Sequence, residues 1–112
     1  MARTDSINMG ELTDTIYYIL LSLLEEKHGY LIMQNVNDMT NGKFTIGPGS
    51  LYTSLKKLLK AELIEMTKEQ KDNKKIYKIT DKGLRMLKNE VRRKKNMVCQ
   101  AEIKLKEKGE KL

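Results

Sequence analysis

The sequence of 112 residues contains few of the side chains that build disulfides, metal sites or membrane spans. A single cysteine, Cys99, excludes an internal disulfide, and Cys99 with the only histidine, His28, is too small a set for structural zinc. The longest apolar run, Ile16–Leu21 with an extension to Leu24, is well short of the ~20 residues of a membrane helix. The N-terminus also lacks a signal-peptide pattern. We therefore expect a cytoplasmic protein with no cofactor, no metal and no membrane partner.

The basic charge is distributed unevenly along the chain. Lys and Arg number 22 against 15 Asp and Glu, which gives a net charge of +7. Residues 1–42 carry a net charge of −4, residues 43–82 carry +5 and residues 83–112 carry +6. A segregated basic charge favours a polyanionic partner such as nucleic acid. A lysine-rich surface that only keeps the protein soluble explains the same counts, so charge alone leaves both interpretations open.

The first half of the chain has the pattern of two helices. Asn8 and Glu11 form a candidate capping box, and apolar residues at helical spacing then predict a helix to about Lys27. Its apolar surface extends around most of the circumference, so we expect it to be buried on two sides. A break at residues 28–29 precedes a second helix, which begins near Tyr30 and ends at residues 41–42.

The second half has a third helix, a hairpin and a long last helix. Pro48 suits the first turn of a helix, in which Leu51, Leu55 and Leu58 form the buried stripe. Residues 63–67 and 76–79 then alternate as two short strands around a basic, turn-prone segment. Thr80 or Asp81 caps a last helix that reaches Lys108, with an apolar stripe interrupted at Lys94.

Three helices followed by a hairpin and a terminal helix form the order of a winged helix-turn-helix. We predict a mainly α fold with a small β-hairpin, divided into a DNA-binding domain at residues 1–80 and a dimerisation helix at residues 81–112. The third helix would read the major groove of double-stranded DNA, and cations on the hairpin would hold phosphates. The candidate DNA-binding residues are Ser50, Tyr52, Thr53, Lys56, Lys57, Lys71, Lys74 and Lys75.

These assignments have simpler alternatives. Ser50 could serve only as a helix-capping or surface serine, and the hairpin lysines could belong to a solvated turn. Tyr52 suits a phosphate hydrogen bond and a core position equally well.

Several segments, taken in order, resemble the PadR-type transcriptional regulators. They are residues 18–24, 28–30, 47–52, 55–58, 63–64 and 77–83, and the resemblance covers roughly residues 12–95. It implies a winged-helix homodimer that binds operator DNA, usually as a repressor, with the terminal helix packed across the partner subunit. The short C-terminal region is similar to the subgroup with a single terminal helix. Multidrug-binding members of that subgroup carry a tryptophan there, whereas this chain has none and places Asn96 and Met97 in that stretch.

The predicted dimer joins the first helix of one subunit to the terminal helix of the other. The expected interface residues are Ile16, Leu20, Leu23, Leu87, Val91 and Val98. A small-molecule inducer would lodge in this interface and change the spacing of the two reading helices. Its expected lining is Met9, Leu12, Ile16, Val91, Lys95, Asn96, Met97 and Cys99. The same residues could instead pack the interface with no ligand.

Two other classes of function compete with DNA binding. Residues 42–49 faintly resemble a phosphate-binding loop but lack the Lys-Ser/Thr pair after the second glycine, so we do not expect an enzyme. A winged helix that binds a protein instead of DNA stays open as the alternative, because fold does not fix function.

Overall fold

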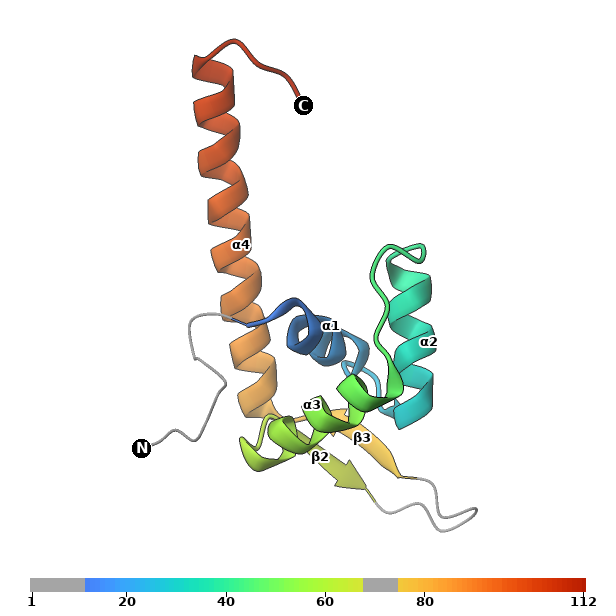
Figure 1. Cartoon of the computed structure of the whole chain (residues 1–112). Coiled ribbons are helices and arrows are strands. Elements are labelled where there is room, and N and C mark those ends of the chain that lie inside the picture. Colours follow the sequence, from blue (N-terminus) through green and yellow to red (C-terminus); the bar gives the residue numbers. More distant parts are fainter. Residues whose placement is uncertain (1–11, 68–74) are drawn as a thin grey trace.

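The computed structural model describes residues 12–67 and 75–112. Figure 1 shows the first helices gathered in one body, a β-hairpin along its edge and a last helix that rises away from it. In chain order the elements are α1 (Asp14–Ser22), β1 (Lys27–His28), α2 (Gly29–Met39), α3 (Pro48–Lys60), β2 (Ile64–Thr67), β3 (Ile76–Ile79) and α4 (Asp81–Glu107). The mainly α winged helix-turn-helix with a long C-terminal helix is therefore confirmed.

One apolar core joins all of these helices. Its fully buried side chains come from α1, α2, α3 and the segment after α3, and α4 adds Met86 and Leu87 from its second turn. The predicted stripe on α3 is confirmed, since Leu51, Leu55 and Leu58 are all buried. The core thus fixes α3 from one side and leaves its other side to solvent.

The first helix is shorter than predicted. It begins at Asp14, where the Thr13 hydroxyl accepts a hydrogen bond from the Ile16 N–H at 3.2 Å. Asn8 and Glu11, the predicted capping box, lie outside the described residues. The helix ends at Ser22 and not near Lys27, because Lys27 enters a strand and its ammonium donates to the Ser22 carbonyl at the end of the helix.

The sheet has three strands and not the two that the sequence predicted. Its order is β1-β3-β2, with both neighbouring pairs antiparallel. The additional strand β1 is only two residues long, and His28 pairs with Ile76. A two-residue strand has too little alternation for a sequence pattern to detect.

The long helix α4 leaves the body after its first half. Of the two predicted caps, Thr80 and Asp81, it is Thr80 that caps α4, because its hydroxyl accepts a hydrogen bond from the Gly83 N–H at 3.0 Å. Beyond Lys94 the side chains of α4 are exposed, with Leu105 partly buried. The molecule is elongated as a result, with principal extents of 58 × 37 × 23 Å.

Candidate nucleic-acid interface

The exposed side of α3 carries hydroxyls and amines and no carboxylate. Ser50, Thr53, Lys56 and Lys57 are exposed or nearly so, and all thirteen residues of α3 lack an acidic side chain. Gly47 is the N-cap of α3 and makes no side-chain capping bond, so Ser50 is an exposed residue of the first turn and not the cap. We call Ser50, Thr53, Lys56 and Lys57 the reading face, because such groups can approach the edges of bases without repulsion from phosphates.

The hairpin of β2 and β3 lies beside α3 and provides the wing. Lys75, the residue before β3, is exposed. Lys71 and Lys74 lie outside the described residues, so their role stays a prediction. The two strands have a regular register in which Met66 pairs with Tyr77 and Glu65 with Lys78. This alternation places Met66 and Tyr77 on one face of the wing and the Glu65–Lys78 ion pair, 3.5 Å long, on the other.

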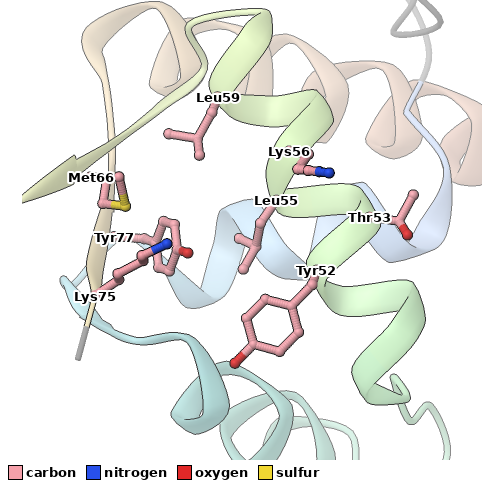
Figure 2. Close-up of a pocket in the computed structure, with 8 residues that line it drawn as sticks. All are labelled: Tyr52, Thr53, Leu55, Lys56, Leu59, Met66, Lys75 and Tyr77. Atoms are coloured by element: carbon pink, nitrogen blue, oxygen red, sulfur yellow. The ribbon is translucent and has the colours of Figure 1, made fainter. Parts of the chain in front are cut away.

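A groove of about 450 Å³ separates α3 from the wing. Figure 2 shows Leu55 and Leu59 of α3 directed toward Met66 and Tyr77 on the strands, while Thr53 points away from the strands. None of the eight described residues that line the groove is acidic. They are Tyr52, Thr53, Leu55, Lys56, Leu59, Met66, Lys75 and Tyr77. Sequence analysis placed Tyr52, Thr53, Lys56 and Lys75 in the interface and missed the apolar floor, which the alternation of β2 could have indicated.

Tyr52 lies at one end of this groove and is 46% exposed. It is therefore not a core residue, and its hydroxyl lies close to Gly29 at the start of α2. Tyr77 is buried across the groove, and this burial, with a smaller contribution from Tyr52, raises the pKa of Tyr77. Tyr77 consequently stays a neutral phenol at physiological pH.

The first turn of α4 holds the end of α3. The Thr80 hydroxyl donates to the Glu62 carbonyl at 2.8 Å, and its N–H donates to the Leu63 carbonyl at 3.1 Å. The Lys82 ammonium donates to the Ala61 carbonyl at 2.9 Å. These bonds tie the segment that ends α3 to the start of α4, so the orientations of the two helices are mechanically linked.

The predicted dimer residues fall into two groups. Leu20 and Leu23 are fully buried within the single chain, and Ile16 and Leu87 are nearly so. In the single chain these four residues therefore belong to the core, and whether they also contact a partner stays a prediction. Val91 and Val98 are 38% and 56% exposed on α4.

The predicted effector residues do not line one cavity in the single chain. Leu12 and Ile16 are buried, whereas Val91 and the C-terminal members, Lys95, Asn96, Met97 and Cys99, are exposed on α4. Met9 lies outside the described residues. The apolar groove on this side of the molecule is instead a hollow of about 380 Å³ between the end of α1 and α4. It is lined by Leu21, Leu24, Leu84, Leu87, Lys88, Val91 and Arg92.

A buried carboxylate joins α4 to the start of α1. The Glu90 side chain is 1% exposed and receives hydrogen bonds from Arg93 at 2.8 and 2.9 Å and from the Leu12 N–H at 3.4 Å. Lys94 lies 3.2 Å from the same carboxylate and 5.0 Å from the centre of the Tyr17 ring. The Arg93 bonds are the main reason that the pKa of Glu90 falls to about 2, against the opposing effect of burial. Sequence analysis did not single out Glu90, although a lone acid among four basic residues was a usable signal.

Over residues 12–67 and 75–112, no helix combines the length and apolarity required to cross a membrane. The fold and the basic reading face define a winged-helix DNA-binding protein. The sequence model of the family described as "Transcriptional regulator PadR-like family" matches residues 19–89, which is more than half of the chain. The protein belongs to the PadR-like family of transcriptional regulators, so the resemblance seen in the sequence is confirmed.

Relatives of known sequence or structure agree with this assignment. An uncharacterized protein of Lysinibacillus sphaericus is 33% identical over 86 residues, which cover 74% of this chain and 76% of that protein. A transcriptional regulator from Clostridium thermocellum shares the fold, with a TM-score of 0.72 at 20% identity over 82% of this chain and 96% of that one. The PadR of Bacillus subtilis, solved in complex with operator DNA, has a TM-score of 0.61 at 26% identity, over 70% of this chain and 47% of that one.

Proposed function

We propose that this regulator binds a palindromic operator as a homodimer and acts as a repressor. The observation that carries the proposal is the reading face of α3, which is exposed, contains no acid and stands beside a wing with the cation Lys75. With α3 in the major groove, Ser50, Thr53 and Lys56 would meet base edges or nearby phosphates, and Lys57 and Lys75 would hold the backbone. We extend the phosphate contacts to Lys71 and Lys74 of the hairpin from their sequence position. The operator complex of the Bacillus subtilis relative supports this choice of partner.

The homodimer is supported by the exposed half of α4. Met97, Val98 and Ile103 are each more than half exposed on a helical segment that packs against no other described element. An isolated helix of about a dozen residues is marginal in water, and most helical stability in proteins comes from packing of an apolar face. A second copy of this chain would cover these residues together with the hollow between α1 and α4. Two-fold symmetry then requires two half-sites about one helical turn, or a multiple of it, apart.

Repression would follow from occupancy of the operator, because a dimer bound over a promoter keeps other proteins off the same DNA and needs no contact with them. An inducer would bind more tightly to a dimer whose two α3 helices are not spaced to fit the operator, and it would thereby reduce the fraction of dimer that can bind DNA. We place that ligand where α1 and α4 of the two subunits meet, near Val91, Lys95 and Met97. Methionine is adaptable and suits such a site. Because α4 holds the end of α3 through Thr80 and Lys82, a shift in α4 packing would reach the reading face.

The test is binding to a random duplex and to the DNA upstream of the coding region over a range of salt concentrations. We expect a steep loss of affinity with salt on both, and tighter binding to an inverted repeat in the upstream DNA. Absence of binding at low salt would reject DNA as the partner and favour the protein-interaction alternative. Transcription that rises when the inverted repeat is occupied would contradict repression.

A further inference from the structure

The groove between α3 and the wing follows α3 over about two helical turns. Tyr52, Leu55 and Leu59 succeed one another along the side of α3 that lines it, at steps of three and four residues. At roughly 1.5 Å of rise per residue, Tyr52 and Leu59 stand about 10 Å apart along the helix axis. The groove thus offers a ligand one continuous wall along the helix.

The floor of the groove is aliphatic. Figure 2 shows Leu55 and Leu59 of α3 directed toward Met66 on β2. Met66 is 46% exposed, although the residue that it pairs with across the sheet, Tyr77, is buried. The flexible thioether of a methionine adapts its shape to the group that lies against it. Such a floor suits a flexible hydrocarbon chain.

Cations and hydrogen-bond donors stand along the edges of this floor. Lys56 of α3 and Lys75, the residue before β3, both line the groove. Tyr52 and Tyr77 add two phenols, and a neutral phenol can donate a hydrogen bond to a carboxylate. The acid of β2, Glu65, lies on the opposite face of the strand, in an ion pair with a lysine of β3. An anion in the groove would therefore meet no carboxylate among the described lining residues.

We propose that this groove binds a free fatty acid of medium chain length. The acyl chain lies along the aliphatic floor, with its methyl end toward Leu59 and Met66. The carboxylate lies at the end of the groove that carries Lys75 and the two phenols, and Lys56 adds a second cation on the α3 edge. The chain length is limited because the wall along α3 is only about two turns long.

A fatty acid in this groove would compete with DNA. Lys56 belongs to the reading face, and Lys75 is the wing cation that the proposed function assigns to phosphates. A carboxylate that neutralises these cations lowers the affinity for a polyanion. The competition rests on the proposed function, whereas binding of the fatty acid does not. The groove shares no residue with the inducer position near Val91, Lys95 and Met97.

The first test locates the acid on the full chain. The methyl groups of the seven methionines are labelled with carbon-13, and the Met66 signal is identified by its loss in Met66→Gln. Octanoate is then titrated while the methyl resonances are recorded. We expect the Met66 signal to shift and saturate, and the signal of Met39, a methionine of similar exposure (42%) at the end of α2, to stay in place. An unmoved Met66, or a shift of Met97 on α4 in its place, would overturn the proposal.

The second test asks whether the ligand is an acyl carboxylate. Affinity should rise about fourfold from hexanoate to octanoate, because a chain in an open groove buries roughly half of its surface. The gain should cease once the chain is longer than the wall along α3. Octanol, which lacks the charge, should bind about tenfold more weakly, and Lys75→Gln should remove this difference while the control Lys106→Gln on the exposed half of α4 keeps it. Equal affinity for octanoate and octanol, or tighter binding of the rigid 2-naphthoate, would reject the acyl carboxylate.

The third test measures competition with a random duplex. Octanoate should weaken duplex binding more than acetate does at the same concentration, because acetate supplies the same ionic strength without the chain. Met66→Gln should remove the extra effect of octanoate, and Met39→Gln should keep it. Equal effects of octanoate and acetate would contradict the competition. If no duplex binds even at low salt, the proposed function fails, and the Met66 shift still decides whether the fatty acid site exists.

Discussion

The phenol of Tyr52 lies so close to Gly29 that a β-carbon at position 29 would stand 3.1 Å from the Tyr52 hydroxyl and 3.3 Å from the ring. This contact joins the reading helix α3 to the start of α2 and explains why a glycine follows His28. The Tyr52 hydroxyl, a predicted phosphate contact, can therefore take this position because residue 29 of α2 has no side chain.

Gly29→Ala should move the Tyr52 ring by a few tenths of an ångström, because the clash involves the far end of a side chain and not the backbone. We expect a destabilisation of about 0.5–1 kcal/mol, together with weaker DNA binding. The measurement is urea unfolding of Gly29→Ala with Tyr52 present and in a Tyr52→Ala background. The cost should disappear in the second background, and an equal cost in both would show that Tyr52 is not the neighbour that matters.

Gly83→Ala should be far more harmful. A β-carbon at Gly83 would lie 2.1 Å from the backbone carbonyl oxygen of Leu63, and neither backbone can yield without breaking the bonds around Thr80. Overpacking of this kind typically costs about 1–3 kcal/mol and sometimes more, so we expect the upper end of that range. Thermal unfolding checks it, with Gly49→Ala as the control, since nothing lies within 4 Å of a β-carbon there.

The sequence predicted the elements whose signal is local and repeated. Leu51, Leu55 and Leu58 at helical spacing identified α3, and the alternation around Met66 and Tyr77 identified the wing. The strand β1 was missed because two residues make no pattern, and Lys27 was taken into α1 for the same reason.

The burial of α1 within its own chain could not be predicted for a different reason. Leu20 and Leu23 were assigned to a partner because α1 is apolar nearly all around, but both are fully buried in the single chain, where α1 packs against α2 and α4. A single sequence shows that a side chain needs burial and does not show which chain provides it. The groove beside α3 and the pairing of Glu90 with Arg93 depend on tertiary packing in the same way.

Thr53→Ala tests base readout. Thr53 is exposed on the side of α3 that faces away from the wing, so its hydroxyl supports DNA contacts and not the core. We expect stability to change little and the preference for the operator over a random duplex to fall by about 1–3 kcal/mol. Lys75→Gln is the companion variant, and it should weaken both duplexes alike. A Thr53→Ala protein that keeps its full preference would remove Thr53 from the base contacts.

Acid should destabilise the protein through Glu90. The pKa of this carboxyl is about 2 in the folded chain against 4.5 for an ordinary glutamate, so the folded state favours the charged form. The stabilisation is fully present above pH 4.5 and is lost as the pH falls toward 2, with a total of roughly 3 kcal/mol. Urea unfolding between pH 6 and pH 2 should show a difference between the unsubstituted protein and Glu90→Gln that shrinks over this window. Glu107→Gln is the control, because Glu107 is exposed and its ion pair with Lys104 is 3.7 Å long. A constant difference across the window would contradict the assignment to Glu90.

Val98→Glu should separate the dimer without unfolding the protomer. Val98 is 56% exposed on the half of α4 that leaves the body, so a charge there meets water in the single chain and an apolar surface only in the dimer. Gln34→Glu adds the same charge at an exposed residue of α2, away from the exposed half of α4, and should leave the dimer intact. Leu20→Asp would not test the dimer, because Leu20 lies in the core of its own chain and the variant should unfold. Light scattering at micromolar concentration gives the mass of each variant, and circular dichroism confirms that it is folded. A folded monomer of the unsubstituted protein would refute the homodimer, and a dimer of Val98→Glu would place the interface elsewhere.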